Sequence, residues 1–369
     1  MRAMPTVREE VIGDLDGVAI RRFSLANSRG MRVQVLNYGG IVQTVEFPDR
    51  DGNLSNIVLG FRTFEEYRRL NPAPNPHNPE GANVYFGALI GRYANPLAGG
   101  RFILRGRVVE VPLNTAWHAL HGGAVGFDQA VWDSAVISDN AGVGVRLAHS
   151  SPHGEMGFPG KLDVVAGYVL DEACRLTLTL EATTNAPTVL NLTSHIYWNL
   201  AGEGSGSCYN QLLSINADHF LPVDSQEAPT GEIRPVADTV FDFSEPVPIG
   251  ERIRVPDEQL LIGHGYDHNW VLRQTDPPSV IQAARVIDPS SGRSLTIRTT
   301  QPGLQFYTGN MLQGTLAGSG GSLYRQGDGF ALETQHYPDS PNHPTFPTTE
   351  LDPGDIYRHI TVFELTNDD

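Results

Sequence analysis

The stretch RLTLTLEATT, Arg175 to Thr184, decides the fold class of this chain. Leucine alternates with threonine through most of it, and this period of two is typical of a β-strand with one buried and one polar face. Short runs with the same alternation, each bounded by turn residues, recur at residues 31–36 (MRVQVL), 294–300 (SLTIRTT) and 359–365 (HITVFEL). The sequence therefore predicts an all-β protein.

The turn residues indicate how these strands are arranged. The 369 residues include 39 glycines and 26 prolines, spread along the whole length. Many short strands separated by such residues are typical of a large antiparallel β-sandwich or barrel. The one segment expected to form a helix is FRTFEEYRRL, residues 61–70. Because no composition break, charged linker or internal repeat divides the chain, we expect one domain over residues 1–369.

Two proline-rich segments interrupt this pattern. Residues 71–83 (NPAPNPHNPEGAN) and 336–355 (HYPDSPNHPTFPTTELDPGD) hold too many prolines for a helix or a central strand. Long loops within a compact domain are often functional, so both segments are candidates to border a site.

Charge and composition exclude several classes of partner. Lys and Arg together number 26 against 42 Asp and Glu, a net charge of -16. Such a charge repels phosphate backbones and anionic lipid surfaces, so neither nucleic acid nor a membrane is an expected partner. The N-terminal stretch lacks an apolar signal region, and no run approaches the length of a membrane span, so we expect a cytoplasmic protein. We expect it to be a monomer or a homodimer. Two cysteines are too few for a disulfide framework.

Familiar catalytic signatures are missing from the sequence. There is no G-x-S-x-G elbow, P-loop, H-E-x-x-H or dinucleotide fingerprint. What remains is a set of polar residues in apolar or glycine-rich surroundings, found at residues 117–123, His195, residues 265–269 and residues 330–334.

His195 and Glu333 are the two candidates for acid–base chemistry. His195 lies within NLTSHIYWNL, residues 191–200, whose β-branched and aromatic content predicts a buried strand. It is therefore either a hydrogen-bonded core histidine or part of a site. Glu333 follows the apolar pair Ala331-Leu332, where burial would raise its pKa and make it a base near neutrality. The alternative is that Glu333 is a strand residue whose side chain is exposed to solvent. Together the two side chains could move two protons on one substrate.

The other polar residues have simpler explanations. The pair Gly122-Gly123 is typical of a tight turn with positive φ. His264 and His268 suggest a metal, but no third ligand follows at suitable spacing, so a turn is favoured and no metal is expected.

Taken together, these segments resemble the aldose 1-epimerase (galactose mutarotase) family. The resemblance runs from about Asn37 to Leu365 and rests on eight stretches in order: NYGG (37–40), YFGALIGRYAN (85–95), LHGG followed by GFDQAVW (120–132), SPHGEMGFPG (151–160), LTSHIYWNLAG (192–202), GYDHNWVL (265–272), QPGLQFYTGN (301–310) and ALETQHYPDSPNHP (331–344).

The resemblance implies a large antiparallel β-sandwich of the galactose mutarotase type, with the sugar in an open cleft on one sheet face. By motif, His195 resembles the acid that protonates the pyranose ring oxygen, and Glu333 the base that takes the C1 hydroxyl proton. The sugar-binding residues implied by the resemblance are Asn95, His121 near the ring oxygen, Asp267 and Gln305. No cofactor or metal is needed.

One position departs from the family pattern. The family usually reads Ala-Asn-Arg where this chain has Ala94-Asn95-Pro96, and proline has no side-chain donor. Arg92 and Arg101 are nearby in sequence but neither occupies the matching position. We expect a cofactor-independent mutarotase that acts on a free aldose such as galactose or glucose. The alternatives are a non-catalytic carbohydrate-binding protein, and an isomerase or lactonase-like enzyme on a modified sugar.

Overall fold

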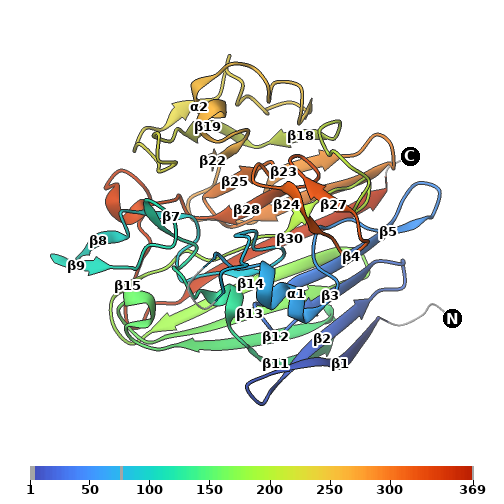
Figure 1. The fold of residues 1–369 in the computed structure, drawn as a ribbon, viewed down its shortest axis with the longest axis horizontal. Coiled ribbons are helices and arrows are strands. Elements are labelled where there is room, and N and C mark those ends of the chain that lie inside the picture. Colours follow the sequence, from blue (N-terminus) through green and yellow to red (C-terminus); the bar gives the residue numbers. More distant parts are fainter. Residues whose placement is uncertain (1–4, 75–77, 368–369) are drawn as a thin grey trace.

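The computed structural model describes residues 5–74 and 78–367, and its largest element is a nine-stranded antiparallel sheet (Figure 1). From edge to edge this sheet contains β11 (Asp133–Asp139), β12 (Gly142–Ser151), β13 (Leu162–Leu170), β14 (Arg175–Thr184), β30 (Tyr357–Asn367), β24 (Arg293–Thr299), β23 (Ile281–Ile287), β18 (Leu212–Ile215) and β21 (Val247–Pro248).

Two further sheets complete the main framework. A six-stranded sheet has the order β17 (Tyr197–Trp198), β28 (Phe330–Gln335), β25 (Gly303–Tyr307), β22 (Asp267–Leu272), β19 (Ala217–Leu221) and β20 (Arg234–Pro235). A five-stranded sheet has the order β1 (Thr6–Leu15), β2 (Val18–Ala26), β3 (Arg32–Leu36), β4 (Val42–Pro48) and β5 (Leu54–Asn56).

Shorter elements connect and cover these sheets. Five two-stranded ladders pair β6 (Leu89–Ile90) with β16 (Thr193–Ser194), β7 (Pro96–Ala98) with β10 (His118–Leu120), β8 (Arg101–Leu104) with β9 (Arg107–Glu110), β15 (Thr188–Val189) with β29 (Glu350–Leu351), and β26 (Gln313–Ala317) with β27 (Leu323–Arg325). The helices are α1 (Phe64–Leu70), α2 (Glu258–Ile262) and single 3-10 turns at Phe127–Gln129, Glu155–Gly157 and Ser340–Asn342. In the described part of the chain, no helix is both long and apolar enough to cross a membrane.

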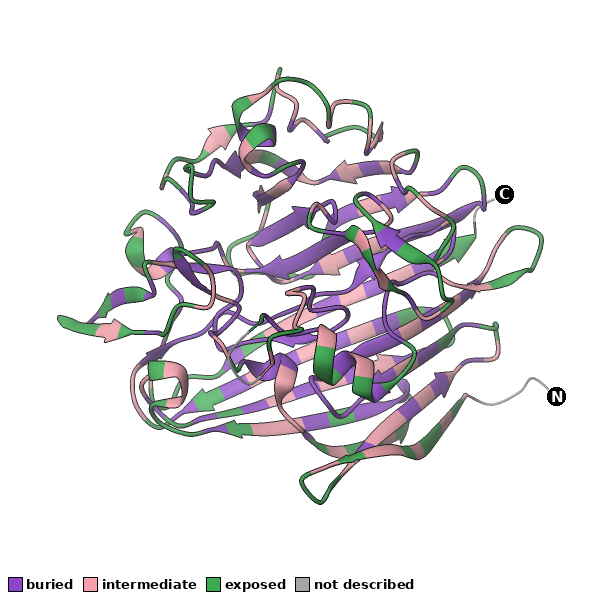
Figure 2. Ribbon diagram, in the orientation of Figure 1, coloured by how far each residue is buried: buried purple, intermediate pink, exposed green. Residues whose placement is uncertain are grey.

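The hydrophobic core lies between the nine-stranded sheet and the other two sheets. Trp198 of the six-stranded sheet packs on Phe363 of β30, with 5.6 Å between ring centroids. The hydroxyls of Thr334 on β28 and Thr361 on β30 also meet, at 2.6 Å. Figure 2 shows buried residues concentrated in the central strands and exposed residues in the peripheral loops. This arrangement confirms the predicted antiparallel β-sandwich.

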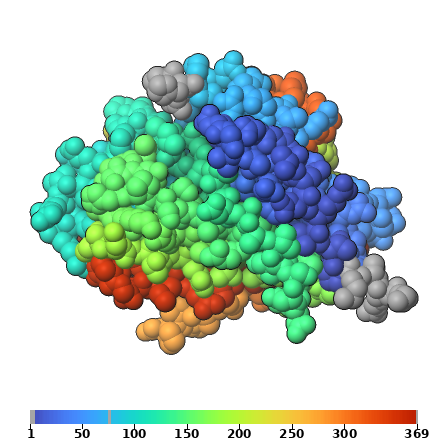
Figure 3. Space-filling model, turned by 90° about the horizontal axis from the view of Figure 1, so that it is seen from below, coloured from blue at the N-terminus to red at the C-terminus, as the bar shows by residue number. Residues whose placement is uncertain are grey.

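Seen from below, one face of the molecule joins segments that are distant in sequence. Figure 3 shows the blue N-terminal region, the green middle of the chain and the red C-terminal strand side by side. The contacts between β2 and β12 and between β1 and β12 agree with this view. The five-stranded sheet therefore packs beside the β11–β12 edge of the large sheet.

The alternating stretches form strands as predicted. RLTLTLEATT corresponds to β14 from its first residue to its last, and the other quoted runs lie in β3, β24 and β30. The predicted helix is present as α1 but begins at Phe64, because Thr63 caps it. The Thr63 hydroxyl accepts a hydrogen bond from the backbone N–H of Glu66, and the Glu66 carboxylate accepts one from the backbone N–H of Thr63. The short helix α2 was not predicted.

The prediction of one buried strand over residues 191–200 is wrong. Only Thr193–Ser194 and Tyr197–Trp198 are strands, and they pair with different partners, β6 and β28. His195 lies between them, where the chain passes from one ladder to the next. The reason is that all side chains of the stretch are buried by tertiary contacts. The stretch therefore shows no alternation of apolar and polar residues that would mark where one ladder ends and the next begins.

Candidate active site

The site is built on the outer face of β28, β25 and β22. In β28, Phe330 and Leu332 belong to the hydrophobic core, so the alternation of a strand turns Glu333 to the opposite face. Gln305 of β25 lies opposite Glu333 in the ladder, and Asn269 of β22 lies opposite Gln305. The three side chains therefore form one polar row across adjacent strands.

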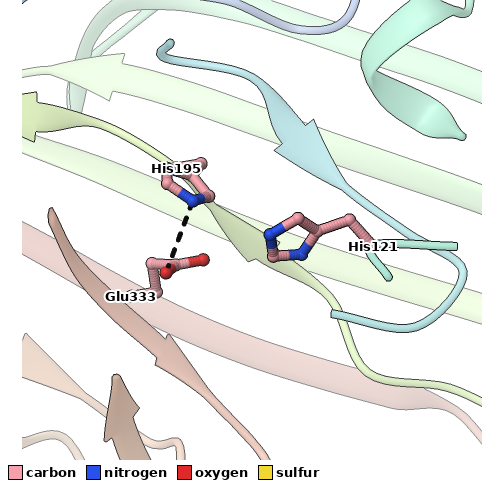
Figure 4. A group of neighbouring side chains, drawn as sticks. All are labelled: His121, His195 and Glu333. Atoms are coloured by element: carbon pink, nitrogen blue, oxygen red, sulfur yellow. Dashed lines mark ion pairs between the residues drawn. The ribbon is translucent and has the colours of Figure 1, made fainter. Parts of the chain in front are cut away.

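His195 faces this row from the crossover between β16 and β17. Its backbone N–H donates to the carbonyl of Ala88, and its own carbonyl accepts from the N–H of Gly87, at 2.8 and 2.9 Å. These bonds fix the imidazole so that Nε2 lies 3.6 Å from Oε1 of Glu333 (Figure 4). Both side chains are almost fully buried, with 6% and 2% of their surfaces exposed.

Burial sets the protonation of this pair. It raises the pKa of Glu333 well above its usual range, and the charge of Asp267 raises it further. Burial also lowers the pKa of His195 to about 4. Both shifts disfavour the charged forms, so burial favours a neutral carboxylic acid beside a neutral imidazole, with one proton available to move between them. Among the described residues, neither Oε2 of Glu333 nor Nδ1 of His195 has a hydrogen-bond partner.

His121 is a second histidine with a defined tautomer. Its Nδ1 accepts a hydrogen bond from the backbone N–H of Asn95, at 3.1 Å. Burial, and to a smaller extent the charge of the neighbouring His195, keeps the pKa of His121 well below its usual value, so the ring is neutral. Because Nδ1 accepts a hydrogen bond, the single ring proton must be on Nε2. Figure 4 shows the ring turned toward the His195–Glu333 pair. The Nε2–H group is thus a donor directed at the place where the pair acts.

Asp267 and Gln305 supply the opposite side of the site. The amide of Gln305 donates to Oδ1 of Asp267 at 2.7 Å. Burial raises the pKa of Asp267 to about 7. The oxygens Oε1 of Gln305 and Oδ1 of Asn269 have no hydrogen-bond partner among the described residues, and both residues border the same cavity. Asn269 was within the polar stretch 265–269 but was given no role from the sequence, although its position two residues after Asp267 on one strand would have placed it on the same face.

These groups line one cavity of about 340 Å³, a volume within the range of small-molecule sites. All six predicted site residues border it: Asn95, His121, His195, Asp267, Gln305 and Glu333. The rings of Tyr85, Tyr197 and Tyr307 form apolar walls. The two proline-rich segments also contribute, through Asn83 and Pro338. Residues 75–77 of the first segment lie outside the described part of the chain.

No guanidinium replaces the one that Pro96 lacks. Pro96 borders the cavity, yet no lysine or arginine does so among the described residues. Arg92 is buried elsewhere, where its guanidinium donates to Ser151 and to the backbone carbonyl of Gly160. Arg101 is exposed on β8. Neither arginine borders the cavity, in keeping with the positions of both outside the matching place in the motif.

The possibility of a metal site rests on His121, His195 and Glu333, whose potential ligand atoms lie within 4.8 Å of one another. A metal-bound imidazole must offer an unprotonated nitrogen and normally donates from its other nitrogen. In His121 the arrangement is reversed, because Nδ1 accepts from a backbone N–H and Nε2 carries the proton. The three residues therefore suit a ligand with hydrogen-bond acceptors and donors better than a cation. His264 and His268 belong to no such cluster among the described residues.

The fold and the site define a β-sandwich protein with a buried carboxyl–imidazole pair in a small-molecule cavity. Comparison with known proteins is consistent with this. The family model described as aldose 1-epimerase matches residues 21–364. The chain is 40% identical to galactose mutarotase of Rattus norvegicus over 98% of its own length and 99% of that protein, and 35% identical to aldose 1-epimerase of Escherichia coli over 95% and 96%. This chain belongs to the aldose 1-epimerase family.

Solved structures agree in fold. A galactose 1-epimerase from Lactobacillus acidophilus superposes with a TM-score of 0.84, 28% identity and 99% coverage of both chains. An aldose epimerase homologue from C. elegans gives a TM-score of 0.80 at 28% identity, with 94% of this chain and 98% of that chain covered.

Proposed function

We propose that this protein interconverts the α and β anomers of a free aldose with Glu333 as the base and His195 as the acid. Family membership and the close, full-length relatives make the chain an aldose 1-epimerase, an isomerase. The observation that supports the assignment of the two roles is the buried pair itself, with Nε2 of His195 3.6 Å from Oε1 of Glu333.

The first step opens the ring and needs two proton transfers. In the empty site one proton is shared by the pair and rests on Glu333, because burial raises the pKa of Glu333 and lowers that of His195. A sugar whose C1 hydroxyl donates to Glu333 and whose ring oxygen accepts from His195 favours the carboxylate–imidazolium form, which has the same total charge. Glu333 then takes the hydroxyl proton while His195 protonates the ring oxygen, so the C1–O5 bond breaks without a free alkoxide.

The second step closes the ring on the other face. Rotation about the C1–C2 bond turns the aldehyde over, and the C5 hydroxyl attacks the opposite face of the carbonyl. Both protons move back, so the pair regains its starting state and no cofactor, metal or covalent intermediate is required. The Nε2–H group of His121 donates near the ring oxygen, and Asp267 with Gln305 holds sugar hydroxyls on the other side of the cavity.

The substrate proposed is a common aldohexose, galactose or glucose. The relatives named galactose mutarotase support this choice, since they align over nearly the whole chain. A purely carbohydrate-binding role is not favoured, because binding needs hydrogen bonds but not a matched acid and base. A cytoplasmic location is proposed as well, and the two free, buried cysteines, Cys174 and Cys208, agree with it.

Polarimetry on freshly dissolved α-galactose and α-glucose tests this function. The purified protein should accelerate the approach to anomeric equilibrium, with a rate proportional to protein concentration. Heat-inactivated protein is the control for buffer catalysis. A folded protein that leaves the spontaneous rate unchanged for a panel of aldoses would contradict the proposal.

A further inference from the structure

Gln335 links the strand that holds Glu333 to the loop that holds His121. It lies two residues after Glu333 on β28, so its side chain is on the same face of the sheet, and it is fully buried. Its Oε1 accepts a hydrogen bond from the side-chain amide of Asn95 at 2.9 Å. The backbone N–H of Asn95 in turn donates to Nδ1 of His121 at 3.1 Å.

The backbone conformation of this loop needs such support. Asn95 and His121 both have positive φ, +64° and +54°, in the left-handed region that residues with a Cβ rarely adopt. Asn and His enter this region more readily than most residues, and the hydrogen bonds to Gln335 and between Asn95 and His121 help hold both in it. The amide of Asn95 therefore has a structural contact, because one of its two N–H donors is bonded to Gln335.

The consequence falls on the proton of His121. While the N–H of Asn95 points at Nδ1, a proton on that nitrogen would meet another donor, so the neutral ring carries its proton on Nε2. If Asn95 is released, the N–H moves away and the ring can turn or place its proton on Nδ1. In either case the donor aimed at the ring oxygen is lost for part of the time.

We propose that Gln335 is a positioning residue that fixes the tautomer and orientation of His121 through Asn95. This inference rests on the proposed function only for its kinetic consequence, because the state of the His121 ring can be measured without substrate. Gln335 touches no reacting atom in this account, and its other side-chain atom, Nε2, has no hydrogen-bond partner among the described residues.

Two substitutions and a matched control separate positioning from simple destabilisation. Gln335→Leu removes the acceptor at similar volume, whereas Gln335→Glu keeps an oxygen acceptor for Asn95. The control is Gln211→Leu, because Gln211 also forms a buried amide pair, with Asn199 at 2.8 Å, and does not border the cavity. All three variants are first compared with wild type by circular dichroism and thermal unfolding.

The first measurement is ¹⁵N–¹H NMR of ¹⁵N-histidine-labelled protein, with the His121 signals assigned by their loss in His121→Gln. We expect an unprotonated Nδ1 and a protonated Nε2 in wild type and Gln211→Leu. In Gln335→Leu this pattern should be averaged between the two nitrogens or reversed, and Gln335→Glu should restore it. Protonated Nδ1 in wild type would overturn the inference, even if Gln335→Leu fails to fold.

The second measurement is anomer interconversion. Misplacing a catalytic group by about 1 Å can cost on the order of a hundredfold, so kcat/KM should fall about ten- to a hundredfold in Gln335→Leu and little in Gln335→Glu or Gln211→Leu. A loss of activity with an unchanged His121 signal would overturn the inference, as would unchanged activity and signal. An inactive wild type with the expected NMR pattern would contradict the proposed function and leave the tautomer result standing.

Discussion

Pro96→Arg is predicted to raise activity, because it supplies a cation that the cavity lacks. Pro96 borders the cavity, and its carbonyl accepts the backbone N–H of Asp339 at 3.1 Å, a bond that any residue at this position can keep. Proline has no N–H, so the substitution removes no backbone donor. The new guanidinium would enter a space bordered by Glu227, Asp267 and Glu333 but, among the described residues, by no lysine or arginine.

The size of the effect follows from one hydrogen bond. A hydrogen bond from a charged group contributes about 1.5 to 3 kcal/mol, and 1.36 kcal/mol corresponds to a factor of ten. If the arginine reaches the sugar, kcat/KM should rise about ten- to a hundredfold on both galactose and glucose. The same charge should lower the pKa of Asp267 from its present value of about 7, because a nearby cation favours the carboxylate.

Steady-state polarimetry over a panel of aldoses measures this effect. Pro96→Gln is the matched control, since it has the same backbone change and a long polar side chain without charge. A gain shared by all tested aldoses and absent from Pro96→Gln is the expected result. A selective fall on one sugar, with no gain on the others, would refute the reasoning and show that the cavity is shaped around Pro96 for that sugar.

Three further predictions concern the pair and its surroundings. The pH profile of kcat/KM should be bell-shaped. Below about pH 4 both His195 and Glu333 are protonated and no base remains, whereas above the raised pKa of Glu333 no acid remains. Constant activity down to pH 3 would count against the pair. Asp267→Asn should raise KM about ten- to a hundredfold with a smaller change in kcat, since Asp267 binds sugar hydroxyls. A fall in kcat by the same factor with KM unchanged would be inconsistent with that role. Dialysis against a strong chelator should leave the rate unchanged, because Nε2 of His121 carries a proton, and a loss restored by one particular metal would disprove this.

The alternating strands were predictable because their signal is local. In RLTLTLEATT each side chain reports its own face of the sheet, and β14 follows the stretch from end to end. Glu333 was found by a different local signal, its position directly after the apolar pair Ala331-Leu332, and on β28 it turns to the face opposite Leu332. The helix α1 lies within the segment that was predicted to be helical, residues 61–70, but its start after the Thr63 cap was not predicted.

The environment of His195 was not predictable, because it depends on contacts between distant segments. Its neighbours belong to two different ladders, and every side chain from Asn191 to Leu200 is buried, so no periodicity marks the crossover. The amide bond from Asn95 to Gln335 joins residues 240 positions apart. From sequence, Asn95 could be assigned to the sugar by its motif, but its hydrogen bond to Gln335 on β28 could not be predicted.

Anomer exchange measured by NMR at equilibrium, for wild type, Glu333→Gln and His195→Asn, tests the central claim most directly. Each substitution removes a proton-transfer group, which typically contributes about a hundred- to ten-thousand-fold, while leaving a side chain of similar shape to bind sugar. In both folded variants the rate of anomer exchange is predicted to fall by that factor, while most of the sugar affinity is retained. The exchange rate of the double variant should fall no further than that of the slower single variant, because the two groups act as a unit. A folded single variant that exchanges anomers at nearly the wild-type rate would contradict the account.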